Sequence, residues 1–200
     1  MKLRGLYAIT PEAADADTLL RQVSAALAGG IAVLQYRRKQ RAGAEEAKAL
    51  AALCRRAGIP FIVNDDIGLA LACDADGAHV GRDDGDPGIS RQKMQGKLLG
   101  VSCYASLDAA RAAVAAGADY VAFGSVFASP TKPSAVRAPL SLFAKAKPLG
   151  VPLVAIGGIT LENAPQLLQA GADGLAVISD LFDAPDITAR ARAYGKLFRT

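Results

Sequence analysis

The sequence has few of the residues that cross-link or metallate small domains. Its 200 residues include three cysteines, Cys54, Cys73 and Cys103, which are odd in number and are never spaced as C-x-x-C. We therefore expect neither a disulfide framework nor a zinc site, and a reducing cytoplasm fits this usage best. The only histidine, His79, is expected to be a hydrogen-bonded structural residue, because lone strand histidines more often are.

Long runs of apolar or charged residues are also missing. No apolar run reaches the roughly 18 residues that a membrane span requires, and the apolar stretch after Met1–Gly5 is too short for a secretory signal. The 23 basic and 19 acidic residues give a net charge of +4, with no Lys/Arg run of the kind that binds nucleic acid. We expect no membrane and no nucleic-acid partner, and the charge suits small anionic ligands.

Short apolar runs alternate with helical patterns along the whole chain. Apolar residues make up 52% of it, which suits one domain over residues 1–200. Strands are predicted at 6–10, 31–36, 60–63, 77–81, 98–102, 120–124, 152–156 and 174–178, and the first and last helices at 14–28 and 186–198. Eight strands that are each followed by a helix predict an α/β fold, a single (β/α)8 TIM barrel. The rival, an open doubly wound sheet, leads us to expect a G-x-G-x-x-G fingerprint, which the sequence lacks.

Glycines mark the ends of most predicted helices. Such glycines, just before the next strand, are typical of left-handed helix C-caps. They are Gly30, Gly58, Gly77, Gly117, Gly150 and Gly171.

The second predicted strand ends in a row of polar residues. Because strand side chains alternate between faces, Gln35, Arg37 and Lys39 are expected to point one way and Leu34 and Tyr36 the other. Two cations and an amide in a barrel interior need anionic partners, which a polyphosphate supplies. The alternative is that Arg37 and Lys39 only pair with nearby acidic residues.

Carboxylates follow the third and fourth predicted strands. Asp65 comes after Asn64 at the tip of one, and Asp84 follows the other, so the two lie on neighbouring loops. Mg²⁺ typically takes one or two protein carboxylates and completes its shell with water and phosphate oxygens, which makes this pair a candidate metal site. The alternative is that Asn64 and Asp65, or Asp83 and Asp84, only begin the helices that follow.

A second anion site is predicted where strands seven and eight end. Loops seven and eight of such barrels often bind phosphate through backbone N–H groups, and a glycine allows close approach. Gly157 and Gly158 follow one strand, and Ser179 follows the other. The long connection 125–137 carries no helical pattern, and we expect a lid there; a rigid connector is the alternative. Cys103 is expected to be a buried apolar residue and not a nucleophile.

Taken together, these motifs resemble the thiamine-phosphate synthase family over essentially the full chain. The matching segments are 35–39 (QYRRK), 64–65 (ND), 81–84 (GRDD), 100–102 (GVS), 124–132 (GSVFASPTK), 157–159 (GGI) and 178–179 (IS). The resemblance implies a (β/α)8 barrel that joins 4-amino-5-hydroxymethyl-2-methylpyrimidine diphosphate to 4-methyl-5-(2-hydroxyethyl)thiazole phosphate, giving thiamine phosphate and diphosphate. One departure is Ser129, where the family pattern leads us to expect threonine; the hydroxyl group is kept.

The resemblance also implies roles for individual residues. Those that would hold the pyrimidine diphosphate are Gln35, Tyr36, Arg37, Arg38, Lys39, Asn64, Ser102 and Lys132. Those that would hold the thiazole phosphate are Ser129, Pro130, Thr131, Gly158, Ile178 and Ser179. Asp65 and Asp84 would bind one Mg²⁺ per subunit, and the catalytic residues would be Arg37, Lys39, Lys132 and Ser102.

In the implied reaction diphosphate leaves first, and the thiazole nitrogen captures the pyrimidinylmethyl cation. Two other functions are weighed: a thiazole tautomerase-like isomerase and a non-catalytic thiazole-phosphate-binding protein. Neither has a use for the diphosphate-binding residues or the metal pair. Assembly into a homo-oligomer stays open.

Overall fold

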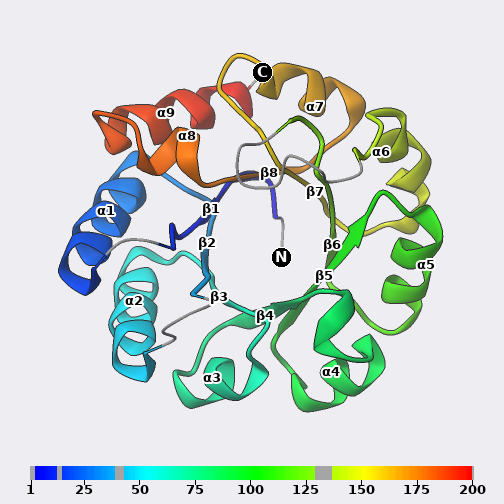
Figure 1. Cartoon of the computed structure of the whole chain (residues 1–200), viewed down its shortest axis with the longest axis horizontal. Helices are drawn as coiled ribbons and strands as arrows, with labels where there is room; N and C mark the ends of the chain where they lie inside the picture. Colours follow the sequence, from blue (N-terminus) through cyan, green and yellow to red (C-terminus); the bar gives the residue numbers. More distant parts are fainter. Residues whose placement is uncertain (1–2, 13–14, 39–42, 129–136, 200) are drawn as a thin grey trace.

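The computed structural model describes residues 3–12, 15–38, 43–128 and 137–199 of the chain. Its eight parallel strands pair in chain order, and β8 pairs with β1 to close the barrel. Helices surround the barrel on all sides (Figure 1). The predicted TIM barrel is therefore confirmed.

Strands and helices alternate throughout the described residues. The strands are β1 (Gly5–Ile9), β2 (Val33–Tyr36), β3 (Phe61–Asn64), β4 (Gly77–Val80), β5 (Leu98–Tyr104), β6 (Tyr120–Phe123), β7 (Leu153–Ile156) and β8 (Gly174–Val177). The helices are α1 (Ala16–Gly29), α2 (Ala44–Ala57), α3 (Ile67–Ala72), α4 (Pro87–Lys93), α5 (Leu107–Ala115), α6 (Ser141–Ala146), α7 (Ala164–Ala170), α8 (Ser179–Phe182) and α9 (Ile187–Leu197). Two 3-10 turns, η1 (Arg82–Asp84) and η2 (Lys147–Leu149), complete them. Every predicted strand is present, with ends that differ by at most two residues.

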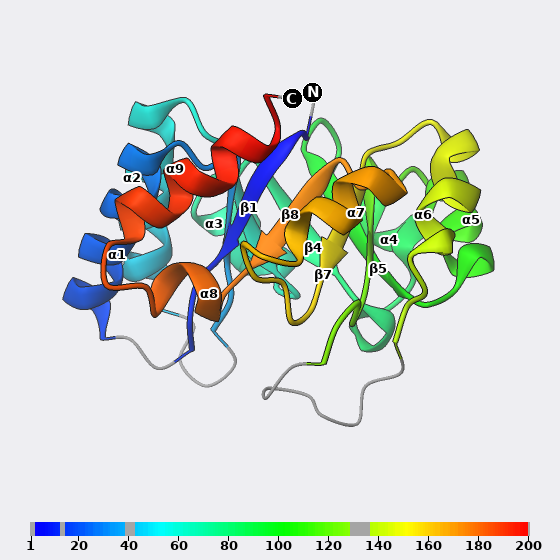
Figure 2. The same cartoon turned by 90° about the horizontal axis from the view of Figure 1, so that it is seen from above.

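Two apolar layers stabilise the barrel, and every strand except β4 contributes apolar side chains to both. In β1, Leu6 and Ala8 belong to the larger cluster between barrel and helices, whereas Tyr7 and Ile9 belong to a smaller cluster in the interior. This alternation follows from the two-residue period of a strand. It fixes which side chains at each strand end can turn toward the barrel mouth, the end where the strands finish, at the bottom of Figure 2.

The glycine prediction is confirmed at five of its six positions. Gly30, Gly58, Gly117, Gly150 and Gly171 have φ between 67° and 104°. Gly77 is the exception, because it begins β4 and the left-handed residue after α3 is Asp74, with φ 51°. Gly77 is needed for space: a Cβ there would lie 2.4 Å from the carbonyl oxygen of Leu98.

Within the described part of the chain, none of the helices combines the length and the apolar character that crossing a bilayer demands.

Candidate active site

The barrel mouth gathers the polar strand ends that the sequence singled out. Val33 and Ile62 face the interior, so Gln35 and Asn64, two residues further along β2 and β3, face the same way. Gln35 is buried and bonds to interior Tyr7, whereas Asn64 is half-buried. The predicted division of β2 is confirmed, because Leu34 and Tyr36 pack in the outer layer.

A chain of hydrogen bonds crosses the barrel below this mouth. Gln35 Nε2 donates to Tyr7 Oη at 2.9 Å, and Tyr7 Oη lies 2.7 Å from Tyr120 Oη. Tyr120 Oη lies 3.2 Å from His79 Nδ1, and His79 Nε2 lies 2.8 Å from Ser102 Oγ. The five residues come from β2, β1, β6, β4 and β5. The chain therefore connects two predicted ligand-binding residues, Gln35 and Ser102, through three residues to which we had given no ligand role.

His79 has the structural environment that we expected of it. It is 7% exposed, and its ring lies 5.5 Å from that of Tyr120 between centroids. Burial lowers the pKa of His79 to about 4, while the Asp84 carboxylate opposes the shift. Its imidazole is therefore neutral near pH 7, with one nitrogen that donates and one that accepts.

Arg37 is held at the mouth through its backbone. The Thr10 hydroxyl accepts from Arg37 N at 2.9 Å and donates to Arg37 O at 3.2 Å, and Thr10 itself is fully buried. The guanidinium pairs with Glu12 through Nη1 at 2.9 Å, as the acid-pairing alternative foresaw. A guanidinium has five N–H donors, so this contact leaves capacity for an anion.

Arg38 and Tyr36 belong to a different network on the outer side of β2. Arg38 forms a two-bond ion pair with Glu46 in the first turn of α2, at 2.9 and 2.8 Å, and Tyr36 Oη donates to Glu46 at 2.7 Å. The guanidinium holds the pKa of Glu46 below its usual value. Both side chains are directed at α2 and make structural contacts there; their binding of the diphosphate stays a prediction, as do the roles of Gln35 and Arg37.

Two roles were considered for the polar residues at the end of β3, helix cap and metal ligand, and Asp66 and Asp65 differ in this respect. Asp66 caps α3, because its Oδ1 accepts from Leu69 N at 2.8 Å. Asp65 stands before the cap with φ 63°, and its N–H donates to the His79 carbonyl at 2.8 Å. The cap that the alternative assigned to Asn64 and Asp65 is thus made by Asp66, and the exposed Asp65 carboxylate stays a candidate metal ligand.

Asp84 lies in η1, after β4, and is also exposed. Its Oδ2 accepts from Gly81 N at 2.7 Å, and the next helix, α4, is capped by Asp86 instead. No group of three or more His, Cys, Asp or Glu suited to a metal occurs among the described residues. A pair of carboxylates is nonetheless a donor set that Mg²⁺ uses when phosphate and water complete its shell, so Asp65 and Asp84 fit that ion.

The opposite side of the mouth is formed by the ends of β7 and β8. Gly157 and Gly158 have φ of 102° and 63°, and a Cβ at Gly158 would lie 2.3 Å from the Ala128 carbonyl oxygen. The absent side chain thus makes room for the loop after β6, and not only for a phosphate as the sequence suggested. Ile178 and Ser179 open α8, in which Leu181 N and Phe182 N donate to the Ile178 carbonyl, so that the N–H groups of Ser179 and Asp180 precede the first intrahelical bonds.

Several predicted site residues lie outside the described part of the chain. These are Lys39, Ser129, Pro130, Thr131 and Lys132. Their roles, and the lid proposed for 125–137, stay predictions. Cys103 is 1% exposed, and burial raises the pKa of its thiol to about 12. The thiol therefore stays protonated near pH 7, which agrees with the expected buried apolar residue.

The sequence suggested no role for Tyr7 and Tyr120, and it placed Gly100 in a matching segment without giving it a role. A Cβ on Gly100 would lie 2.1 Å from the Tyr120 ring and 2.5 Å from His79 Nδ1, so this glycine creates the space in which the chain of hydrogen bonds forms. One signal was present in the sequence: both tyrosines lie on strands, and a buried tyrosine hydroxyl usually finds a partner.

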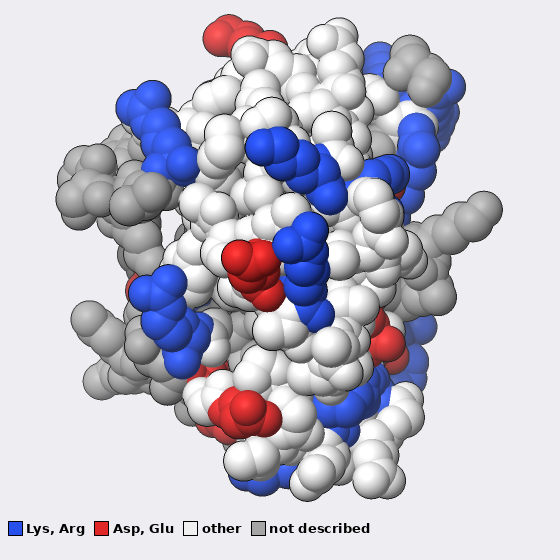
Figure 3. All heavy atoms as spheres, turned by 90° about the vertical axis from the view of Figure 1, so that its right-hand side faces the viewer, with Lys and Arg blue, Asp and Glu red and all other residues white. Residues whose placement is uncertain are grey.

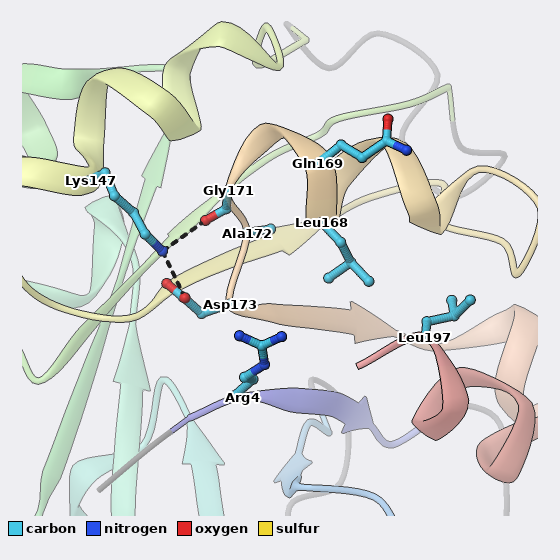
Figure 4. Close-up of a pocket in the computed structure, with 8 residues that line it drawn as sticks. All are labelled: Arg4, Lys147, Leu168, Gln169, Gly171, Ala172, Asp173 and Leu197. Carbon is cyan, nitrogen blue, oxygen red and sulfur yellow. Dashed lines mark hydrogen bonds and ion pairs between the residues drawn. The ribbon is translucent and has the colours of Figure 1, made fainter. Parts of the chain in front are cut away.

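A cavity of about 300 Å³ lies at the other end of the barrel, where β1 begins and α9 ends (Figure 4). Lys147 bonds there to Asp173 at 2.8 Å and to the Gly171 carbonyl at 3.2 Å. Asp173 also accepts from Leu153 N at 3.0 Å, so these groups connect β7, β8 and η2. This end of a TIM barrel serves stability, which makes the cavity a poor candidate for catalysis.

Charged side chains on one flank of the barrel are dispersed. On the face that carries α5, Lys and Arg side chains are separated by uncharged and acidic surface (Figure 3). Such spacing differs from the continuous basic stripe typical of a nucleic-acid-binding face.

Comparisons with known proteins agree with the fold and the strand-end motifs. A family model described as thiamine monophosphate synthase matches residues 6–181. A thiamine-phosphate synthase of Aromatoleum aromaticum is 59% identical, covering 98% of this chain and 97% of the relative, and one of Bordetella pertussis is 58% identical, covering 97% and 94%. The solved thiamine phosphate pyrophosphorylase from Pyrococcus furiosus superposes with a TM-score of 0.85 at 32% identity, covering 99% of this chain and 96% of that one.

Proposed function

The chain belongs to the thiamine monophosphate synthase family, and on that basis we propose that it condenses the pyrimidine diphosphate with the thiazole phosphate. The products are thiamine phosphate and diphosphate, and the enzyme is a transferase of thiamine biosynthesis. The identity of 59% over nearly the whole length of both chains carries this proposal.

The reaction breaks one bond and forms another. The bond between the pyrimidine methylene carbon and the diphosphate oxygen breaks, and the oxygen leaves with the electron pair. The resulting pyrimidinylmethyl cation then accepts the lone pair of the thiazole nitrogen. No protein nucleophile is needed, which agrees with the burial of Cys103.

Residues on the β2 to β5 side would receive the pyrimidine diphosphate. Arg37, with guanidinium N–H groups beyond the one that pairs with Glu12, and Ser102 would stabilise the charge that develops on the leaving group. Gln35 and Asn64, which turn inward from β2 and β3, would orient the substrate. Lys39 and Lys132 are proposed to add further positive charge.

Asp65 and Asp84 would hold one Mg²⁺, which when bound neutralises charge on the diphosphate oxygens. Their exposure after adjacent strands β3 and β4 supports this assignment. On the other side of the mouth, backbone N–H groups of Gly158, Ile178 and Ser179, together with Ser129, Pro130 and Thr131, would receive the thiazole phosphate.

The test supplies the pyrimidine diphosphate, the thiazole phosphate and Mg²⁺ and follows thiamine phosphate by its oxidation to fluorescent thiochrome. We expect product only when all three are present. Isomerisation of thiazole carboxylate phosphate without thiamine phosphate would favour the tautomerase alternative. Binding of thiazole phosphate without either reaction would favour the carrier.

A further inference from the structure

We propose that Tyr7, Tyr120 and His79 are positioning residues whose hydrogen bonds make the Ser102 hydroxyl a donor toward the barrel mouth. The inference rests on the proposed function, because the acceptor of that hydrogen would be the leaving diphosphate. It adds a specific task for three buried residues of the barrel interior.

The direction of the chain starts at Gln35. Its Nε2 can only donate, so Tyr7 Oη accepts at 2.9 Å. The hydrogen of Tyr7 is then available for the 2.7 Å contact with Tyr120 Oη. The hydrogen of Tyr120 is in turn available for His79 Nδ1, at 3.2 Å.

The buried imidazole of His79 continues this direction across to β5 through its two ring nitrogens. If His79 Nδ1 accepts, the ring proton is on Nε2, which donates to Ser102 Oγ at 2.8 Å. The Ser102 oxygen then receives a hydrogen bond and keeps its own hydrogen for another acceptor. Ser102 is half-buried near the end of β5, so that hydrogen can be directed at an anion in the mouth.

Because these residues are buried, each hydrogen bond of the chain contributes to the stability of the fold. Tyr7 and Tyr120 are 2% and 0% exposed, and a buried hydroxyl without a partner costs free energy. Gly100 leaves the space in which the Tyr120 ring and His79 meet. Reversing one hydrogen bond would require reversing its neighbours, so the chain favours one direction as a unit.

The first test reads the position of the histidine proton. Because His79 is the only histidine, the nitrogen NMR spectrum of protein labelled with ¹⁵N-histidine reports a single ring. We expect Nδ1 to resonate as an unprotonated nitrogen and Nε2 as a protonated one. Tyr120→Phe should convert this into a mixture of the two forms. A proton on Nδ1 in the wild-type protein would overturn the proposal, since Ser102 would then donate to His79.

The second test is a double-mutant cycle in turnover. Tyr120→Phe should lower kcat about tenfold and leave the KM for thiazole phosphate unchanged, a smaller loss than the roughly 10²- to 10³-fold expected when a direct donor is deleted. In a Ser102→Ala background the same change should have almost no effect, because both act through one group. Multiplying effects would mean that Tyr120 only supports the fold. Tyr7→Phe provides a second entry to the cycle if Tyr120→Phe does not fold.

Thr188→Val is the matched control, because it also removes a hydroxyl, one that donates to the Ala25 carbonyl at 2.9 Å outside the barrel. This variant should be less stable than the wild-type protein, with kcat and the histidine spectrum unchanged.

Binding of inorganic diphosphate with Mg²⁺, measured by calorimetry, separates this inference from the proposed function. A wild-type protein that makes no thiamine phosphate refutes the function alone. Equal diphosphate binding by wild type and Tyr120→Phe refutes the positioning role.

Discussion

The hydroxyl oxygens of Tyr7 and Tyr120 lie 2.7 Å apart inside the barrel, although 113 residues separate them in the chain. Barrel closure places β1 and β6 three strands apart around an interior in which these two rings approach each other. Burial raises the pKa of both phenols, so both stay protonated and able to donate. This contact joins the Gln35 side of the mouth to the Ser102 side.

We predict that Asp65→Asn and Asp84→Asn each abolish Mg²⁺-dependent turnover with little change in thermal melting, because both carboxylates are exposed at the mouth. Asp66→Ala is the neighbouring control. It removes the cap of α3 and should cost about 1 kcal/mol of stability while activity persists. Near-normal turnover in either of the first two variants would exclude that residue from the metal site.

Two adjacent arginines should behave oppositely. Arg37→Ala should reduce turnover by roughly 10²-fold with a small effect on stability, because it removes a charge at the leaving group. Arg38→Ala should instead destabilise the fold by about 3 kcal/mol, since it leaves the largely buried Glu46 carboxylate without its cationic partner. Kinetics and urea unfolding of both variants decide this. A larger rate loss in Arg38→Ala than in Arg37→Ala would indicate that Arg38 contacts the substrate.

Gly100→Ala should destabilise the protein by at least about 3 kcal/mol and lower kcat, because the added methyl group overlaps the Tyr120 ring and His79. Gly195→Ala in α9 is the control: a Cβ there meets no atom within 4 Å. It should stabilise the helix by about 0.5–1 kcal/mol. The prediction fails if Gly100→Ala melts at the wild-type temperature.

Because His79 is buried, we predict that the free energy of unfolding depends on pH. Its pKa falls from 6.5 in the unfolded chain to about 4 in the folded one, so between these values the unfolded state binds the extra proton. Stability from this residue is complete above pH 6.5 and declines by at most about 3 kcal/mol as the pH falls to about 4. His79→Gln should remove that part of the slope in urea unfolding without added metal. An unchanged slope would show that other groups produce it.

The alternation of strand and helix, and hence the barrel, could be predicted from the sequence because it depends on local pattern. Apolar runs of strand length, helical spacing and the terminating glycines each involve residues close together in the chain. The division of β2 into an inward Gln35 and an outward Tyr36 has the same origin, since it needs only the two-residue period of a strand. That the carboxylates after β3 and β4 lie on neighbouring loops could also be predicted, because consecutive parallel strands finish at one end of the barrel.

The tertiary structure alone decided which of these polar groups already have partners. Arg37 and Arg38 look alike in sequence, yet Arg38 is paired with Glu46 because α2 begins beside the end of β2. Gly77 looked like a helix cap, but its position against Leu98 depends on the pairing of β4 with β5. The bonds that join Tyr7, Tyr120, His79 and Ser102 form only when four strands close around a shared interior. Local pattern reports which way a side chain faces, whereas the group that it meets there is set by packing across the barrel.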